Sequence, residues 1–412
     1  MNGQQVLYLI VCFIAVEFVF EKILSWLNLK TWKQPLPDAV KDLYEEKKYR
    51  EAEEYAKVNF RFSLVSSVFS LIVSLVFLIT GGFAWVDAWA QTVSSSYIVQ
   101  PLLFFAVLSL ASGIIGLPFE FYNTFVIEEK FGFNKTTIRT FVTDKLKGVV
   151  LGAVIGGGLL ALLAFLFHLL GSYFWLAAWG VVAAFSIFMA MFYTSILLPI
   201  FNKLTPLQDG KLRNSIEQYA SKVQFSLTNI LVMDGSKRSA KANAFFSGLG
   251  SKKSIVLYDT LVSDMTTEEI TAVLAHEVGH YKRKHILQGM ALSVLQMGLM
   301  FFLFGLLSSS QILAQALGAS QINFHLALVA FSLLYSPVST VIGILFNAFS
   351  RKNEYEADAY ARATYAAEPL ITALKKMSVK HLSNLQPHPW YVVVNYSHPT
   401  LLQRMNALTT NQ

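Results

Sequence analysis

Seven stretches of the chain are apolar over a length that suits a membrane-spanning helix. Such a helix needs about 20 mostly apolar residues to cross the hydrocarbon core of a bilayer. Hydrophobic residues make up 54% of the chain and charged residues only 14%, whereas a soluble domain carries about 25% charged residues. The sequence therefore predicts a mainly α-helical, polytopic membrane protein. The seven stretches cover approximately residues 6–24, 62–84, 97–118, 148–170, 173–198, 287–309 and 323–349.

The first stretch differs from the others because it contains Glu17 and Glu21. A charge buried in lipid is costly, so both carboxylates are expected to face the protein interior or a water-filled cavity. No basic segment precedes this stretch, which predicts a retained membrane helix rather than a cleaved signal peptide. The only cysteine, Cys12, lies in the same stretch. An intramolecular disulfide and a cysteine-based metal cluster are therefore excluded.

Apart from Lys22 in the first stretch, lysine and arginine are confined to alternate connections between the apolar stretches. Segments 25–61, 119–147 and 199–286 and the tail after residue 350 are rich in them, whereas 85–96 and 310–322 contain none. The positive-inside rule makes the basic side cytoplasmic, with the N-terminus outside and the C-terminus inside. This distribution accounts for the net charge of +7 without a nucleic-acid partner. A soluble helical core at 287–349 would not explain the alternation.

Two of the basic segments have secondary-structure patterns of their own. Residues 36–60 predict an amphipathic helix that starts at Pro37. In 199–286, the apolar runs 230–233 and 255–258 predict strands, and residues 248–253 supply a turn between them. A helical pattern begins at Thr266 or Thr267, with Glu268 and Glu269 in its first turn.

The helix that begins at Thr266 carries His276-Glu277-Val278-Gly279-His280. Histidines at i and i+4 share one helical face, so both imidazoles can reach one metal ion. Glu277 is placed to take a proton from metal-bound water. Two imidazoles and a carboxylate suit a catalytic zinc ion with an open position for water, although such a site also binds other divalent metals. The alternative is a pair of packed or surface histidines.

The segment after the last apolar stretch supplies the carboxylate that the site lacks. Either Glu354 or Glu356 can be the third ligand. Glu354 is favoured because Asp358 lies four residues later on the same helical face, where it can orient a ligand histidine. Glu356 points roughly the opposite way, which favours a solvated side chain or a pair with a lysine.

Three further residues have competing interpretations. His285 lies off the metal-binding face and is interpreted as a histidine at the membrane interface. His398 is either a donor to a transition-state oxyanion or a helix-start histidine beside Pro399. Arg404 either pairs with a carboxylate of the site or lies on the surface.

Several long, irregular motifs resemble those of the type I CAAX prenyl endopeptidases. These are seven-span membrane zinc proteases that cleave near the C-terminus of isoprenylated proteins. The resemblance runs through most of the chain. The motifs are LPF at 117–119, FVIEEK at 125–130, GFNK at 132–135, PIFNKLTPL at 199–207, ANAF at 242–245, HEVGH at 276–280, SRKNEYEAD at 350–358, and SHPT at 397–400 followed by Arg404.

The resemblance implies a role for each matching position. His276, His280 and Glu354 would bind one Zn²⁺ per chain, with Glu277 as the base. His398 would contact the substrate carbonyl or the oxyanion. Asn243, with Ala244 and Phe245, would hold the substrate backbone, which agrees with strand addition if an edge strand forms near 243–247. The family fold would surround a large water-filled chamber with seven helices, closed by a zincin-like catalytic domain with a small sheet.

The resemblance also implies a domain organisation and a location. Residues 1–198 would hold five transmembrane helices, 287–349 two more, and 199–286 with 350–412 the catalytic domain. The tail Thr409–Gln412 has no basic retrieval signal, which favours a prokaryotic member in the bacterial cytoplasmic membrane. The alternative is the endoplasmic reticulum membrane. The expected partners are the lipid bilayer and a peptide or protein substrate, with or without a prenyl group; the sequence leaves the oligomeric state open.

Two other functions are alternatives to a CAAX-type endopeptidase. Proteases that remove damaged membrane proteins share the zinc motifs but are shorter and have fewer spans. A transporter or channel with a structural metal site would use Glu17 and Glu21. A structural zinc ion normally has four protein ligands, whereas this site offers three beside a general base, so an enzyme is favoured.

Overall fold

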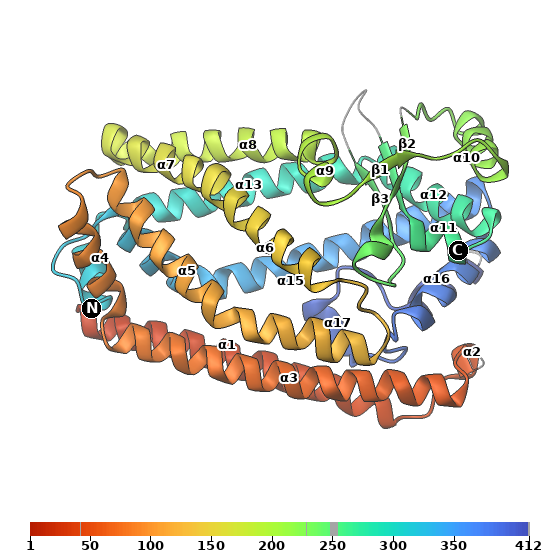
Figure 1. Cartoon of the computed structure of the whole chain (residues 1–412), viewed down its shortest axis with the longest axis horizontal. Helices are drawn as coiled ribbons and strands as arrows, with labels where there is room; N and C mark the ends of the chain where they lie inside the picture. The colour runs from red at the N-terminus through yellow and green to blue at the C-terminus, as the bar shows by residue number, and fades with distance from the viewer. Residues whose placement is uncertain (42, 228, 248–253, 411–412) are drawn as a thin grey trace.

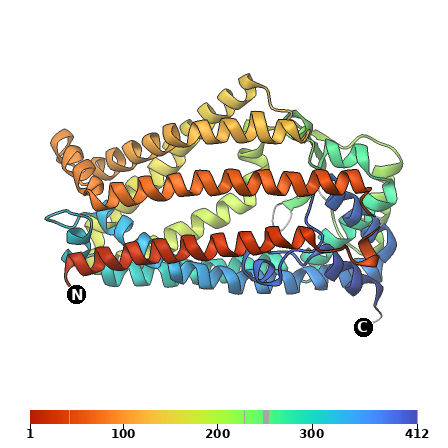
Figure 2. The ribbon, with the colours of Figure 1, turned by 90° about the horizontal axis from the view of Figure 1, so that it is seen from below.

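In the computed structural model, long helices run side by side along the longest axis of the molecule, and a small sheet lies at one end (Figures 1 and 2). The structure describes residues 1–41, 43–227, 229–247 and 254–410. The predicted mainly helical fold with a small sheet is confirmed. The long helices are α1 (Gly3–Lys30), α3 (Glu46–Ile79), α5 (Val99–Tyr122), α6 (Ile138–Leu151), α7 (Gly157–Leu170), α8 (Phe174–Ile196), α13 (His285–Leu307) and α15 (Phe324–Thr364).

Within the described part of the chain, five helical segments are long and apolar enough to cross a membrane, and they indicate a multi-pass membrane protein. Only 6% to 17% of the apolar window in each is buried inside the protein, so lipid must cover the remaining apolar surface. One segment, Ile138–Phe201, contains two of the predicted stretches, joined through η4 (Gly171–Tyr173). The helix α1 is not among the five, so the count of seven spans stays a prediction. The other four segments are Glu46–Ile79, Val99–Glu128, His285–Leu307 and Phe324–Thr364.

The connections at the end of the bundle far from the sheet are short helices rather than the loops expected there. They are α4 (Gly82–Val93) and α14 (Gln311–Ala316). A buried polar cluster joins α4 to the start of α15. Asp87 Oδ1 lies 2.6 Å from His325 Nε2 and accepts a 3.0 Å hydrogen bond from Asn323. His325 therefore has a structural role.

The amphipathic helix expected at 36–60 does not form as a separate element. A one-turn helix, α2 (Asp38–Lys41), is followed by α3, which starts at Glu46 and continues to Ile79. The charged residues of 46–60 therefore form the first turns of a helix that then enters the membrane. Helix propagation favours this continuity, because no proline or glycine interrupts 46–79. The minor elements around these helices are η1 (Thr31–Lys33), η2 (Asn123–Glu128), η3 (Gly152–Gly156) and α9 (Leu198–Phe201).

Four strands form one sheet in the order β1-β2-β4-β3. They are β1 (Leu204–Pro206), β2 (Asn229–Met233), β3 (Ala244–Ser247) and β4 (Ser254–Tyr258). The strands predicted at 230–233 and 255–258 are confirmed as β2 and β4, which pair in parallel. β3 pairs with β4 antiparallel and forms an edge of the sheet. The turn expected at 248–253 lies outside the described residues.

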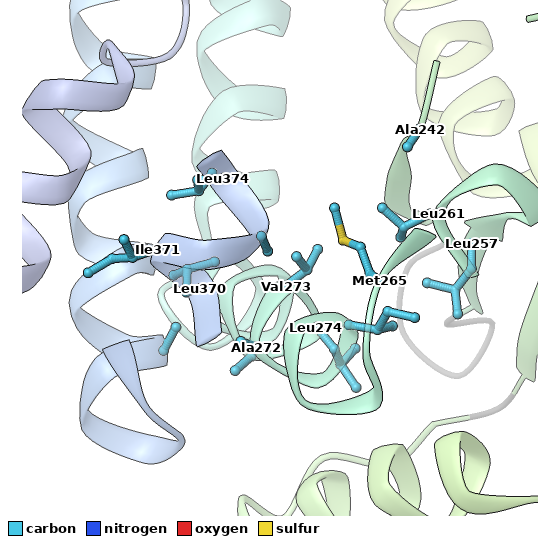
Figure 3. Close-up of a cluster of buried hydrophobic side chains, with 14 of the residues drawn as sticks. Ala242, Leu257, Leu261, Met265, Ala272, Val273, Leu274, Leu370, Ile371 and Leu374 are labelled. Atoms are coloured by element: carbon cyan, nitrogen blue, oxygen red, sulfur yellow. The ribbon is translucent and has the colours of Figure 1, made fainter. Parts of the chain in front are cut away.

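The sheet and the surrounding helices share one hydrophobic core. Figure 3 shows side chains of α12 (Thr267–Lys282) between β4 and α11 (Asp259–Asp264) on one side and α16 (Ala367–Lys380) on the other. The same core includes Trp32, Val40 and Ile127 from the membrane part of the chain, so the two parts pack as one body. The remaining elements are α10 (Lys211–Lys222), η5 (Gly235–Lys237), α17 (Pro389–Asn395) and α18 (Leu401–Thr409).

Polar contacts fix the segment before β3 to the membrane helices. Arg238 makes two hydrogen bonds to Asp144 of α6, at 2.7 and 3.0 Å. Lys241 donates to Glu128 of η2 at 3.1 Å, and the hydroxyl of Tyr55 in α3 donates to the same carboxylate. The edge strand is therefore positioned by three membrane helices as well as by its own sheet.

Candidate metal centre

The helix that carries both motif histidines begins with a capping box. Thr266 accepts from the amide of Glu269 at 3.3 Å, and Glu269 accepts from the amide of Thr266 at 2.8 Å. This arrangement satisfies two otherwise unpaired amides at the start of α12. Most of α12 is buried, including His276. The predicted helix start at Thr266 is confirmed. The capping box stabilises the first turn of α12, and burial holds the rest of the helix in place.

A close crossing between α12 and α15 brings the two motifs together. A Cβ atom at Gly279 would lie 3.0 Å from both the Cα and the carbonyl oxygen of Ala357, and 3.1 Å from Cβ of Tyr360. Contacts of this length are tighter than nine in ten real Cβ contacts, so the close crossing favours glycine. It places the face of α12 with His276 and His280 opposite the face of α15 with Glu354.

His276, His280 and Glu354 lie together, with one ligand atom from each within 4.8 Å of the others. The two Nε2 atoms are 3.1 Å apart. Glu354 Oε1 is 3.1 Å from His280 Nε2, and Glu354 Oε2 is 3.4 Å from His276 Nε2. Glu354, rather than Glu356, is therefore the carboxylate that faces both imidazoles.

The donor atoms fit a divalent metal ion. Glu354 Oε2 is buried and has no hydrogen-bond partner among the described residues. His398 Nδ1 and Arg404 Nη1 approach it to 3.0 and 3.5 Å without hydrogen-bonding geometry. A buried carboxylate oxygen with no partner is costly, and a cation held between this oxygen and the two imidazoles would remove that cost. Two imidazoles and a carboxylate form a ligand set typical of catalytic zinc.

Asp358 and Arg404 orient His276 from the Nδ1 side of its ring. Asp358 Oδ1 lies 2.8 Å from His276 Nδ1, and Arg404 donates to both Asp358 oxygens at 2.6 and 2.8 Å. All three side chains are buried. Asp358 therefore holds His276 with Nε2 toward the cluster, and Arg404 pairs with a site carboxylate, one of the two interpretations left open by the sequence.

The carboxylates also change the protonation of His276. Burial lowers the pKa of this imidazole, but the neighbouring carboxylates of Asp358 and Glu354 outweigh burial and raise the pKa to about 9. A metal ligand must be a neutral imidazole. Metal binding at neutral pH therefore releases a proton from His276, so the affinity for metal should fall as the pH falls.

Glu277 and His398 are the more accessible residues of the site. Glu277 is half-buried, and 64% of the His398 side chain is exposed. His398 precedes the cap of α18, where Thr400 and Gln403 form a capping box. Both side chains can therefore meet a substrate, while the ligands behind them are buried.

Two residues that the sequence patterns did not single out, Asn347 and Arg351, hold the His398 segment to α15. Asn347 donates to the carbonyl of Val394 at 2.7 Å. Arg351 donates to the carbonyls of Val392 and Tyr396 at 3.2 and 2.6 Å. Arg351 lies in the matched motif at 350–358, but a spacing pattern does not reveal a contact to a distant backbone.

His285 lies closer to the site than its position in the sequence suggested. It is buried, and its Nδ1 is 3.0 Å from Nδ1 of His280. Its Nε2 is 3.2 Å from Glu356, which also lies 3.8 Å from Lys352. The interpretation of His285 as an interface histidine was incomplete, because it contacts a candidate ligand. Glu356 pairs with a lysine as expected, and also with His285.

Asn243 lies at the start of the edge strand and is exposed. Its carbonyl accepts from the amide of Tyr258 at 3.0 Å, and its side-chain oxygen accepts from the amide of Ala244 at 2.9 Å. Ala244 and Phe245 are half-buried in β3. The strand lies beside the motif helix, since the ring of Phe246 is 5.8 Å from that of Tyr281 in α12.

The sequence matches the descriptions of two known families. The family description "CAAX prenyl protease N-terminal, five membrane helices" matches residues 25–203, and "Peptidase family M48" matches residues 206–412. The chain belongs to peptidase family M48. This M48 chain is therefore a membrane metalloprotease, and the predicted resemblance is confirmed.

Relatives of this M48 chain match along nearly all of its length. CAAX prenyl protease 1 of Saccharomyces cerevisiae is 34% identical over 96% of this chain and 93% of its own. The human CAAX prenyl protease 1 homolog is 30% identical over 95% and 93%. The crystal structure of S. mikatae Ste24p covers 100% of both chains with a TM-score of 0.94 and 32% identity. These relatives are eukaryotic, so the expected prokaryotic source stays a prediction.

Proposed function

We propose that the chain is a zinc metalloendopeptidase that cleaves near the C-terminus of (iso)prenylated CAAX-type or similar peptides. His276, His280 and Glu354 bind one Zn²⁺ per chain. The observation that carries this assignment is the cluster of three ligand atoms within 4.8 Å, including a buried Glu354 oxygen without a hydrogen-bond partner among the described residues. When bound, zinc acidifies a water molecule and polarises the scissile carbonyl.

Glu277 and His398 act on the reacting groups. Glu277 takes the proton of the attacking water and passes it to the leaving amine, because it follows the ligand His276 directly and remains accessible. His398 donates a hydrogen bond to the oxyanion. Its ring is exposed, and its Nδ1 lies 3.0 Å from the ligand Glu354, so its reach includes the position where negative charge develops.

The substrate binds as an extended strand beside β3. Asn243 is hydrogen-bonded to Tyr258 of β4. In the alternating antiparallel pattern, the backbone of Ala244 therefore faces the free edge of β3, whereas that of Phe245 faces Val256 of β4. An added strand would pair with that free edge. The exposed amide of Asn243 orients the substrate backbone at the end of that strand. Since β3 packs beside α12, the added strand passes the metal ligands.

The preference for CAAX-type substrates rests on the printed names of the relatives, CAAX prenyl protease 1 and its homologs. Removal of damaged membrane proteins is the alternative activity of the same site, and transport with a structural metal is the less favoured one. The match to the five-helix N-terminal region over residues 25–203 favours the CAAX-type branch, because it covers the helices that shorter quality-control proteases lack.

Seven membrane helices surround a water-filled chamber in the arrangement that we propose. Residues 1–198 and 287–349 form the membrane part, and 199–286 with 350–412 form the catalytic part. The distribution of basic residues supports a catalytic site on the cytoplasmic side and an N-terminus outside. The expected bacterial cytoplasmic membrane and its alternative, the endoplasmic reticulum membrane, both have a cytoplasmic face, so the orientation is the same in either.

Cleavage of matched peptides tests the substrate. The purified full-length protein, loaded with zinc, is given a farnesylated CAAX peptide, the same peptide without the farnesyl group, and an unfolded membrane protein. Preferential cleavage of the farnesylated peptide, lost after chelation and restored by zinc, supports the proposal. Equal cleavage of the two peptides, or cleavage of the unfolded protein alone, would favour the quality-control activity.

A further inference from the structure

The two candidate histidine ligands are held by different partners. His276 contacts Asp358, which in turn binds Arg404, as described above. His280 contacts His285, whose Nδ1 lies 3.0 Å from Nδ1 of His280. His285 in turn contacts Glu356, which lies 3.2 Å from its Nε2. We infer that His285 and Glu356 are positioning residues, which fix the His280 ring so that its Nε2 faces the metal. This inference rests on the metal site proposed above.

The series of contacts from Glu356 through His285 to His280 has defined hydrogen-bond directions. Glu356, when ionised, can only accept, so Nε2 of His285 donates to it. The neutral His285 then has an unprotonated Nδ1, which accepts from Nδ1 of His280. His280 is left with an unprotonated Nε2, the atom that lies 3.1 Å from both Glu354 Oε1 and His276 Nε2. The three residues thus select the ring form of His280 that can bind a metal ion.

The local backbone explains how a residue five positions after His280 can return to it. Helix α12 ends at Lys282, and Lys284 has a φ of 60°, in the left-handed region. This turn starts α13 at His285 and directs its ring back toward the end of α12. His285 is therefore buried although Lys282, Arg283 and Lys284 around it are exposed.

The contact also connects the metal site to two membrane helices. His285 is the first residue of α13, and Glu356 lies on α15 beyond its apolar part. The His280 ring is thus supported by α13 and α15 together, whereas the His276 ring is supported by α15 and α18. The orientation of His280 consequently depends on the placement of α13 relative to α15.

Zinc affinity of the full-length protein tests the inference. Loss of a partner behind a metal-binding histidine typically weakens metal binding by roughly 10- to 100-fold. His285→Leu removes the acceptor for His280 and should weaken zinc binding to this extent in competition with a chelator. His285→Asn keeps an oxygen acceptor close to the position of Nδ1 and should restore most of the affinity. A purely structural role of His285 would not distinguish these two variants.

Two further variants test the inference even if a substitution at position 285 prevents the protein from folding. Glu356→Leu removes the acceptor for His285 and should weaken zinc binding less than His285→Leu does. Lys352→Gln removes only the exposed neighbour of Glu356 and should bind zinc like the parent. In Co²⁺-loaded protein, the visible absorption spectrum should change for Glu356→Leu and stay unchanged for Lys352→Gln.

The inference is overturned if folded His285→Leu or Glu356→Leu binds zinc as tightly as the parent, or if His285→Asn is as weak as His285→Leu. These measurements need no substrate. A parent that binds zinc but cleaves no peptide would therefore contradict the proposed peptidase activity without affecting the result for His285. A parent that binds no zinc would overturn the metal assignment and this inference together.

Discussion

Gly279→Ala adds one methyl group at the crossing of α12 and α15. The added Cβ would lie 3.0 Å from two backbone atoms of Ala357, and ordinary contacts begin at 3.4 Å. Because a backbone cannot rotate away as a side chain can, the helices must separate by about 0.4 Å, which is more than the ~0.2 Å tolerance of metal–ligand distances. His276 and His280 on one helix and Glu354 on the other then no longer match one metal ion.

The expected stability change is smaller than the change in metal binding. Overpacking costs about 1–3 kcal/mol, while replacing a helical glycine by alanine returns up to about 1 kcal/mol. The net destabilisation of the metal-free protein is therefore about 0–3 kcal/mol by these two terms. Zinc affinity should fall by roughly 10-fold or more, as for other disturbances of ligand geometry, and peptide cleavage at limiting zinc should fall with it.

Chelator competition measures the zinc affinity of Gly279→Ala, and thermal unfolding in the presence of chelator measures its stability. Gly289→Ala is the matched control, because a Cβ at Gly289 in α13 meets nothing within 4 Å. It should keep the parent's zinc affinity. If Gly279→Ala binds zinc as tightly as Gly289→Ala does, the rigid crossing is not what sets the ligand geometry, and the reasoning is refuted.

Three other substitutions separate the roles at the site. Glu277→Gln should abolish peptide cleavage while metal analysis still finds one zinc ion per chain; full activity would contradict its role as the base. Asp358→Asn should weaken zinc binding by roughly 10- to 100-fold and lower the thermal unfolding temperature, since Arg404 loses a buried charged partner; an unchanged affinity would mean that Asp358 does not orient His276. Asn243→Ala should raise KM for peptides with little effect on zinc content, measured by steady-state kinetics and metal analysis. A fall in kcat at unchanged KM would instead place Asn243 in the chemical step.

The metal ligands could be predicted from the sequence because they depend on helical periodicity. The i and i+4 spacing fixes the common face of His276 and His280, and the same reasoning selected Glu354 through Asp358. Strands β2 and β4 were predictable for a similar reason, since each is a short apolar run. These features are local, so one segment at a time was enough.

The contacts of His285 and Arg351 could not be predicted in this way. On a continued α12 helix, His285 would point away from the ligands, but the left-handed residue Lys284 ends the helix and reverses the direction of the ring. Arg351 bonds to carbonyls more than 40 positions later, which no spacing pattern indicates. The edge position of β3 likewise depends on the order in which the strands pair.

The length of α15 gives the bilayer a mechanical connection to the catalytic centre. From Phe324 to Glu354, the helix extends about 45 Å, so a tilt of about 2° would move Glu354 by about 1.6 Å over that length. Helices change tilt when the thickness of the hydrocarbon core changes. Because α12 is pressed against α15 at Gly279, the histidines must move with Glu354. A thinner or thicker bilayer then shifts the intact centre sideways over the lipid surface, and that position determines which bond of a membrane-tethered chain can reach it.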